Sequence, residues 1–133
     1  MLYALDSNVV IDILRGDKVI KQKLLQVRTT DKISIPPYCL YEIVRGLFDK
    51  NAKRQFSDLR LLQKIIYKPG IDESMVMEKA AEIYIKRKRA GLAIEDIDIL
   101  IAAWCIIADA TLVTSNTKHF DSIDNLKLEN WRE

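Results

Sequence analysis

Cysteine, histidine, glycine and proline are all scarce in this sequence of 133 residues. The two cysteines, Cys39 and Cys105, lie in apolar surroundings and lack the spacing of a metal-binding or redox motif. A disulfide-stabilised scaffold is therefore excluded, and two buried, reduced thiols are expected. The four glycines and three prolines form no low-complexity linker, and no internal repeat is present. One domain spanning residues 1–133 is expected.

Long hydrophobic runs are missing as well. The longest run, residues 99–108, is too short to cross a bilayer. The N-terminus reaches Asp6 before the apolar core of a signal peptide could form. We therefore expect a cytoplasmic protein without membrane contact. The net charge of +2 excludes a strongly basic protein that wraps nucleic acid. If the chain handles RNA, local basic patches and a metal ion must supply the attraction.

The composition that remains, 49% apolar and 30% charged, is sufficient for a globular core. Short apolar segments alternate with segments of helical periodicity, which predicts an α/β fold with a mainly parallel sheet covered on both faces. Strands are expected at residues 2–5, 33–35, 111–114 and 126–128, and a short turn or helix at residues 116–120. Helices are expected at residues 9–14 after the capping residues 6–8, then at 18–27, 38–48, 52–66, 72–90 and 95–108.

Two of these helices are amphipathic. In the helix at residues 52–66, the apolar residues lie mostly on one side: Phe56, Leu59, Leu61 and Leu62. In the helix at residues 72–90, five residues are expected to face the core: Met75, Val76, Ala80, Ile83 and Tyr84.

Polar side chains follow the expected strands at the points where the strands end. They are Asp6, Glu42 near the start of the helix after the second strand, Asp96 and Asp98 at the start of the last long helix, and Asn116 and His119 after the third strand. Ligands of parallel sheets bind at this edge. Clustered carboxylates repel one another unless a divalent cation such as Mg²⁺ or Mn²⁺ joins them. The pattern suggests metal-assisted hydrolysis of a phosphodiester or phosphoryl group, while acids at helix starts also serve simply as caps.

Five segments resemble, in order, the motifs of VapC-type PIN domains. They are residues 5–16 (LDSNVVIDILRG), 41–47 (YEIVRGL), 94–103 (IEDIDILIAA), 111–120 (TLVTSNTKHF) and the tail at 126–131 (LKLENW). Any one motif is weak alone, but four in order at these spacings are specific. The match covers essentially the whole chain.

This resemblance implies a three-layer α/β/α fold and an endoribonuclease that depends on Mg²⁺ or Mn²⁺. Asp6 and Asp98 would hold the metal, Glu42 would ligate it or orient the attacking water, and Asn116 would complete the catalytic set. The resemblance also implies an RNA substrate such as tRNA or rRNA and a homodimer. It further implies inhibition by a cognate VapB-type antitoxin, and the protein would contact DNA only through this antitoxin. Single-stranded or looped RNA is the expected target, because proteins read unstacked bases.

The fourth segment departs from the family's pattern. Many members carry an acid there, whereas this chain has Asn116 and His119 as its polar residues. An asparagine amide can still orient a water or a carboxylate, and one bound ion is expected. His119 is expected at the rim of the site. Asp96 lies two residues from Asp98 and so points to nearly the opposite side of the helix, where it is expected to cap the helix or support the ligands.

The basic residues and two of the helices leave further alternatives open. Residues 86–89 form either a solvated helix end or a contact for RNA phosphates, and Arg15 and Arg45 are comparable candidates. The helices at residues 52–66 and 72–90 are candidate dimer interfaces.

Three other functions compete with the toxin. One is an RNA-processing nuclease without an antitoxin, and another is a PIN-like binding module that has lost catalysis. The third is a small phosphatase, for which an Asp-x-Asp motif would be expected after the first strand, but position 8 is Asn.

Overall fold

The central sheet is short and entirely parallel. Over residues 1–92 and 94–132, which the computed structural model describes, it contains β1 (Leu2–Leu5), β2 (Lys32–Ser34), β3 (Ala110–Val113) and β4 (Lys127–Glu129), arranged in the order β2-β1-β3-β4. In the central strand, Tyr3 lies opposite Ile33 on one side and Thr111 on the other. The expected strand positions are confirmed to within about two residues.

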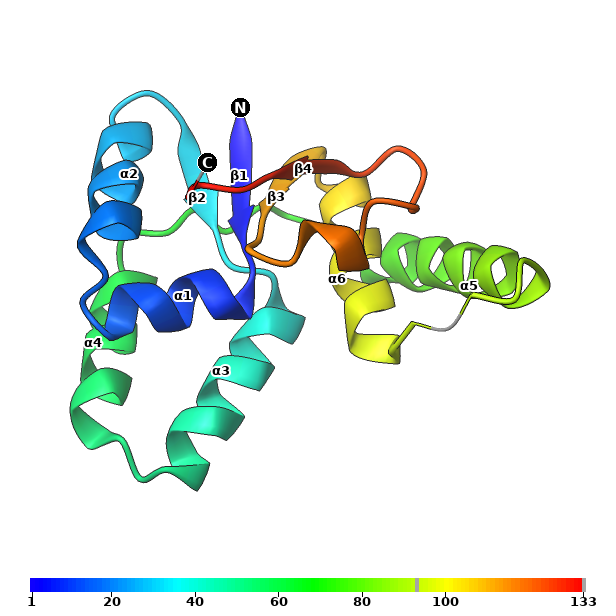
Figure 1. Ribbon diagram of the computed structural model, residues 1–133. Coiled ribbons are helices and arrows are strands. Elements are labelled where there is room, and N and C mark those ends of the chain that lie inside the picture. The colour runs from blue at the N-terminus through cyan, green and yellow to red at the C-terminus, as the bar shows by residue number, and fades with distance from the viewer. Residues whose placement is uncertain (93, 133) are drawn as a thin grey trace.

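Helices cover both faces of this sheet. The helices are α1 (Ser7–Leu14), α2 (Lys18–Arg28), α3 (Pro37–Asp49), α4 (Lys53–Gln63), α5 (Glu73–Arg89) and α6 (Asp96–Ile107), followed by the short 3-10 helix η1 (Thr117–His119). Helices α1 to α4 lie on one side of the sheet and α5 and α6 on the other (Figure 1). The expected three-layer α/β/α fold is confirmed.

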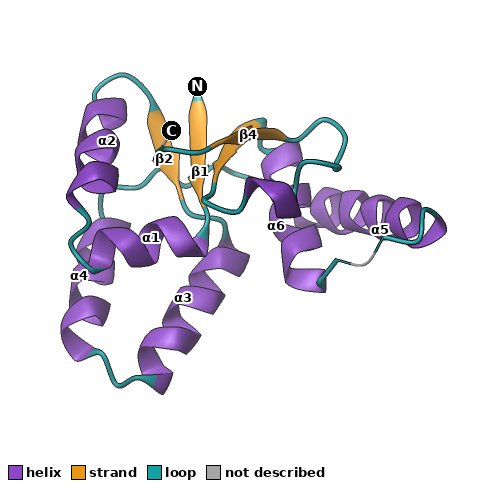
Figure 2. Cartoon of the chain, viewed as in Figure 1, coloured by secondary structure: helices purple, strands orange, loops and turns teal. Residues whose placement is uncertain are grey.

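The strand order explains the two helical layers. The connection from β1 to β2 steps toward one edge of the sheet, and the connection from β2 to β3 crosses back over β1. Parallel crossovers are right-handed, which places α1 and α2 of the first connection and α5 and α6 of the second on opposite faces. Helices α3 and α4, at the start of the second connection, pack against α1 instead. Because the strands are parallel, all four end at the same edge, where α1 and α3 begin (Figure 2).

Local signals in the sequence set the helix boundaries. Asp17 caps α2 by accepting a hydrogen bond from the N–H of Ile20 at 3.1 Å, and Asp72 caps α5 by accepting one from the N–H of Ser74 at 2.9 Å. Gly16 and Gly91 follow the last turns of α1 and α5 with φ values of +87° and +72°. This left-handed conformation suits glycine and ends each helix. The expected helix ends at residues 14 and 90 are thus confirmed to within one residue.

The core is centred on β1, β3 and α6. Every residue of β3 is buried, and residues 101–105 of α6 are buried on all sides. Cys39 and Cys105 are buried and free, as expected. None of the helices within the described part of the chain is long and apolar enough to cross a membrane.

The prediction that Met75 and Tyr84 of α5 face the core is wrong, because both are exposed, as is Leu61 of α4. Consecutive helical residues are turned by about 100° from each other. Each of the three therefore falls outside the narrow stripe of its helix that meets the rest of the protein. The buried residues of these stripes are Leu59 and Leu62 in α4 and Val76, Ala80 and Ile83 in α5.

Candidate active site

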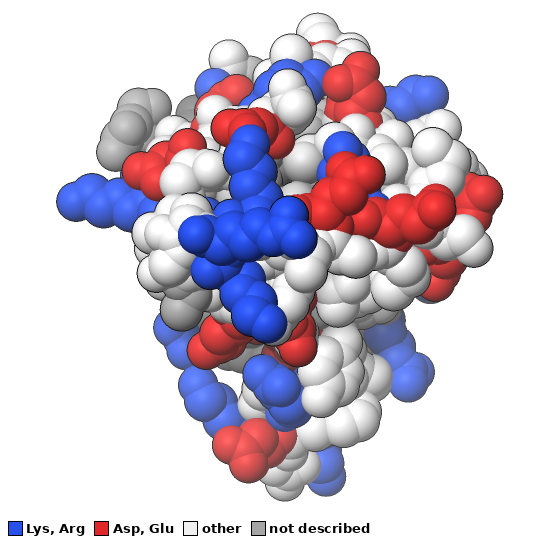
Figure 3. Space-filling model, turned by 90° about the vertical axis from the view of Figure 1, so that its right-hand side faces the viewer, with Lys and Arg blue, Asp and Glu red and all other residues white. Residues whose placement is uncertain are grey.

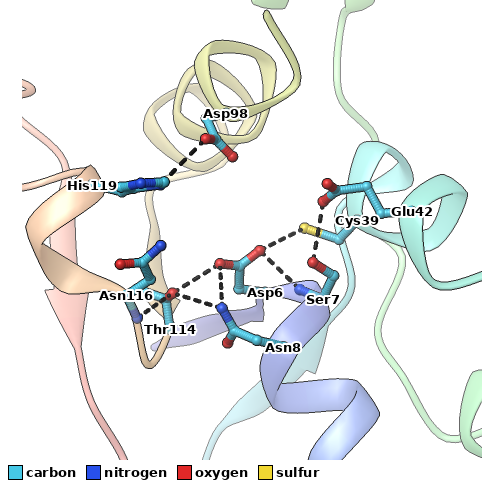
Figure 4. Close-up of polar contacts among 9 residues, drawn as sticks. All are labelled: Asp6, Ser7, Asn8, Cys39, Glu42, Asp98, Thr114, Asn116 and His119. Atoms are coloured by element: carbon cyan, nitrogen blue, oxygen red, sulfur yellow. Dashed lines mark hydrogen bonds and ion pairs between the residues drawn. The ribbon is translucent and has the colours of Figure 1, made fainter. Parts of the chain in front are cut away.

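The predicted polar residues meet at the carboxyl edge of the sheet. Asp6 follows the last residue of β1 and lies at the centre of the group, only 5% exposed (Figure 4). Glu42 comes from α3, and Asp98 comes from the first turn of α6. The loop after β3 supplies Asn116. Residues up to 110 positions apart in the sequence are brought together because the parallel strands all end here.

Asp6 is held by donors on both of its oxygens. Oδ1 accepts hydrogen bonds from the N–H of Ser7 at 2.8 Å and from the thiol of Cys39 at 3.6 Å. Oδ2 accepts from the hydroxyl of Thr114 at 2.8 Å and from the amide of Asn8 at 3.3 Å. Burial raises the pKa of the Cys39 thiol well above its ordinary value, so this sulfur keeps the proton that it donates. The carboxylate is therefore fixed in orientation by the protein itself.

A second ring of hydrogen bonds supports these donors. The Thr114 hydroxyl accepts from the Asn116 N–H at 3.0 Å and from the Asn8 amide at 3.4 Å. The other end of the Asn8 amide accepts from the Ser115 N–H at 3.3 Å. The loop after β3 is thereby tied to the start of α1, on either side of Asp6.

Glu42 lies near Asp6 on the α3 side of the site and is half-buried (Figure 4). Its Oε1 accepts a hydrogen bond from the hydroxyl of Ser7 at 3.1 Å. Burial raises the pKa of Glu42, and the negative charges of Asp6 and Asp98 add to this shift. Ser7 thus links two of the carboxylates, through its N–H to Asp6 and through its hydroxyl to Glu42.

In Figure 4, Asp98 lies above Asp6, and Glu42 lies above it and to the right. Its side chain is 19% exposed, and its Oδ2 lies 3.5 Å from Nδ1 of His119. Burial raises the pKa of Asp98, Asp6 and Glu95 raise it further, and His119 partly opposes the shift. His119 itself is 60% exposed, which agrees with the expected rim position. Asp96 is exposed and lies outside the hydrogen bonds of the group.

Asn116 is placed less firmly than the three carboxylates. Its backbone N–H donates to Thr114, while its side chain makes no hydrogen bond within residues 1–92 and 94–132. The amide lies on the same side of Asp6 as His119 (Figure 4). The structure brings this residue to the site but leaves its side chain free to turn toward a ligand.

Comparison with known proteins places this geometry in a family. Residues 3–126 match the model of the PIN domain. This chain belongs to the PIN-domain family. Among its relatives, Ribonuclease VapC2 of Rickettsia felis is 32% identical over 98% of each chain. Ribonuclease VapC1 of Methanocaldococcus jannaschii is 29% identical over 93% of this chain and 82% of the relative.

Solved structures agree with this PIN-domain assignment. A chain in the crystal structure of VapBC2 from Rickettsia felis bound to a DNA fragment from its promoter has a TM-score of 0.89 with this chain. The two are 28% identical over 98% of this chain and 99% of the other. The structure of VapBC-1 from nontypeable Haemophilus influenzae has a TM-score of 0.84 at 23% identity and full coverage of both chains, a likeness that shows the fold alone.

The donor set of this PIN domain fits a hard divalent cation. Asp6, Glu42 and Asp98 gather negative charge at one place, and the causes of the raised pKa values of Glu42 and Asp98 include neighbouring carboxylates. Oxygen donors of this kind suit Mg²⁺ or Mn²⁺. Within the described residues, no three His, Cys, Asp or Glu side chains are close enough together to ligate one ion directly. An ion held here would therefore keep several waters, as Mg²⁺ usually does.

Sequence reasoning missed four residues of the site: Ser7, Asn8, Cys39 and Thr114. Ser7 and Asn8 were interpreted only as capping residues, Cys39 only as a buried thiol and Thr114 only as the end of a strand. The available signal was adjacency, because three of these four residues lie within the first and fourth motifs. Cys39 gave no comparable signal, because it is 33 residues from Asp6 in the sequence.

Proposed function

We propose that this PIN domain is a metal-dependent endoribonuclease that acts as a toxin and is neutralised by a cognate VapB-type antitoxin. The observation that carries the catalytic part of the proposal is the carboxylate group of Asp6, Glu42 and Asp98. These acids lie near one another at the carboxyl edge of the sheet, and a cation would relieve their mutual repulsion. The names of the relatives, Ribonuclease VapC1 and VapC2, support RNA as the substrate class.

Each side chain has a distinct role in this proposal. Asp6 and Asp98 would hold the cation, directly or through its waters. When bound, Mg²⁺ or Mn²⁺ would supply a water of lowered pKa and charge neutralisation at the phosphoryl oxygens. Glu42 accepts a proton from the attacking water, because a partly buried carboxyl of raised pKa is the better base. Ser7 holds one oxygen of Glu42 in place, and Asn116 orients a water or an RNA oxygen through its free amide.

The partners follow from the solved relatives and from the exposed surface. The VapBC structures support a VapB-type antitoxin as the partner and contact with DNA through that antitoxin. Exposed apolar side chains on α4 and α5, among them Leu61, Met75 and Tyr84, support a homodimer. The RNA substrate and the two free, buried thiols suit a reducing, cytoplasmic location.

The binding-module alternative is also favoured by one observation. The fourth motif offers Asn116 instead of an acid, so the charge available to the metal is lower than in a four-acid site. A PIN domain of this kind could bind RNA or an antitoxin without cleaving RNA. A binding module and a nuclease differ in one measurable result, because only the nuclease cleaves RNA when the metal is added.

The test is the cleavage of total cellular RNA by the purified chain. Reactions contain Mg²⁺, Mn²⁺ or EDTA, and Asp6→Ala and Asp98→Ala are assayed beside the wild type, with Asp96→Ala as the matched control in the same helical turn as Asp98. We expect discrete cuts that need the metal, disappear in the first two variants and persist in the control. Equal behaviour of all the proteins, or no cleavage by a folded wild type, would reject catalysis and leave the binding module.

A further inference from the structure

Two hollows in the surface reach the carboxylate group from different elements. The first, here called the Lys118 hollow, has a volume of about 510 Å³ and is lined by Arg87 of α5 and by Lys118 and His119 of η1. Asp98 also lines this hollow, so the hollow opens directly onto one of the three acids. A second acidic side chain in its wall, Glu95, is exposed.

The second, here called the Arg45 hollow, has a volume of about 400 Å³ and includes Glu42 in its wall. Its basic side chains come from α1 and α3 and the residues that follow them: Arg15, Arg45 and Lys50. The further acid in this hollow is Asp12, whose carboxylate is paired with Arg132 at 2.9 Å. Arg132 is shared between Asp12 and Asp17, so the positive charge of this hollow comes from its three basic side chains, which outnumber its two acids.

The two hollows approach Asp6 from different sides. In Figure 4, Asp98 lies above Asp6 and His119 to its upper left, whereas Ser7 and Glu42 lie to its right. The Lys118 hollow includes the first pair and the Arg45 hollow includes the second. The acidic centre is therefore flanked by positive charge on both sides.

The basic side chains of these hollows are available to a ligand. Within residues 1–92 and 94–132, Arg15, Arg45, Lys50 and Lys118 form no ion pair with a carboxylate. In contrast, Lys86, the residue directly before Arg87 in α5, is paired with Asp124. Figure 3 shows the wider basic group on the side of the molecule that carries α5.

Arg87 has donor capacity that the protein leaves unused. Its Nη1 donates to the hydroxyl of Ser122. Its Nε is buried and is the one such side-chain atom in the described part of the chain without a hydrogen-bond partner. Buried donors normally have an acceptor, and a guanidinium edge matches the spacing of phosphate oxygens.

We propose that the two hollows bind backbone phosphates on either side of the scissile one, so that an RNA strand crosses the site from the Arg45 hollow over Asp6 to the Lys118 hollow. The inference rests on the proposed ribonuclease function and adds the path of the strand. An acidic centre repels a polyanion, so fixed cations on both flanks hold the strand while the central phosphate meets the metal. Phosphate contacts of this kind position the strand and leave its sequence to be read elsewhere.

The test measures binding separately from cleavage. A fluorescein-labelled single-stranded oligouridylate is titrated with the full chain in EDTA over a range of salt concentrations, and binding is followed by anisotropy. Arg45→Gln and Lys118→Gln each remove one exposed charge from one hollow. Matched controls are Arg28→Gln and Lys21→Gln, exposed residues of α2 that line neither hollow. The same proteins are then assayed for RNA cleavage with Mg²⁺.

We expect the slope of log affinity against log salt to become shallower by about 0.7 for each hollow variant and by about 1.4 for the double variant. The controls should keep the wild-type slope. These slopes with no cleavage by any protein would uphold the path and reject the nuclease. Cleavage with wild-type slopes in the hollow variants would overturn the path and leave the nuclease standing. A change on one flank only, or an equal change in the controls, would also overturn it, because the strand would not cross the site.

Discussion

Asp6 and Asp98 are carboxylates of the same group, yet the protein surrounds them differently. Asp6 accepts hydrogen bonds from Ser7, Asn8, Cys39 and Thr114, and it is nearly inaccessible to solvent. Asp98 has a single partner, the exposed His119, and its pKa is raised by burial and by neighbouring acids. One carboxylate is thus fixed before any ligand arrives, whereas the other is left in an unfavourable charged state that a cation would relieve.

This difference separates what the fold stabilises from what the function requires. Donors aimed at Asp6 make its negative charge part of the folded structure. The charge on Asp98 is poorly compensated, which is the usual condition of a site that trades stability for activity. The same isosteric change, Asp to Asn, should therefore have opposite effects on stability at the two positions and similar effects on activity.

The largest effect is expected on cleavage. Asp6→Asn and Asp98→Asn each remove a carboxylate from the proposed metal site, so the rate of RNA cleavage should fall on the order of a thousandfold in either variant. Single-turnover cleavage at saturating Mg²⁺ measures this loss, and Asp96→Asn is the control. If only one of the two variants lost activity, the two acids would not share one centre.

The next largest effect is expected when a hydrogen-bond donor to Asp6 is removed and both carboxylates are kept. Thr114→Val deletes the hydroxyl that donates to Asp6 at 2.8 Å and should reduce cleavage by about 10- to 100-fold. Thr111→Val, which changes a buried threonine of β3, the strand that Thr114 directly follows, is the matched control. Metal titrations of the cleavage rate should show a weaker apparent metal affinity only for Thr114→Val. Equal losses in the two variants would point to general damage to β3.

Stability should change in opposite directions at the two acids. In EDTA at neutral pH, Asp6→Asn places an amide against four donors and should lower the free energy of unfolding by about 1–3 kcal/mol. Asp98→Asn removes a poorly compensated charge and should raise it by about 1 kcal/mol, which corresponds to a few degrees in Tm. Urea denaturation measures both changes. A loss of stability in both variants would show that Asp98 is also held by the fold.

The gain from Asp98→Asn should depend on pH. The folded pKa of Asp98 is raised, so its contribution to stability is complete below the ordinary aspartate pKa of about 3.9 and is lost as pH rises through the higher folded value. The Tm difference between Asp98→Asn and wild type should therefore be greatest near neutral pH and shrink toward pH 4. Thermal melts in EDTA across this range test the sign, and a difference that grows with acid would contradict it.

The smallest effect is expected at Asn116. Its side chain has no hydrogen-bond partner among the described residues, so Asn116→Ala should leave Tm within about 1 °C of the wild type. Cleavage should fall by less than about tenfold, because the amide only orients a ligand. Parallel melts and cleavage rates measure this, and a loss as large as that of Asp98→Asn would make Asn116 a principal ligand.

Much of the site was predictable because strand ends are visible in a sequence. Asp6 follows a short apolar segment, and Asp98 begins a strongly apolar helix, so a parallel sheet brings both to one edge. Helix geometry also separated Asp98 from the exposed Asp96. The supporting residues were harder to predict, because a thiol such as Cys39 has the same local pattern whether it packs in a core or donates to Asp6.

The errors have a related physical cause. Leu61, Met75 and Tyr84 have helical spacing that suits a core, but the width of the buried stripe depends on which elements pack against α4 and α5. Likewise, the pairing of Asp12 with Arg132 joins residues 120 positions apart, and periodicity carries no information about such a contact. The sequence pattern therefore predicts whether a segment is a helix or a strand, but it does not predict which elements pack against that segment.

The most direct test of the central claim combines two measurements on Asp98→Asn. One preparation is melted in EDTA and then assayed for RNA cleavage with Mg²⁺ beside the wild type. We expect a protein that melts at a higher temperature and does not cleave, so that the lost activity cannot be attributed to unfolding. Cleavage at the wild-type rate by this stable variant would contradict the claim that the carboxylates of this PIN domain form a metal-dependent ribonuclease centre.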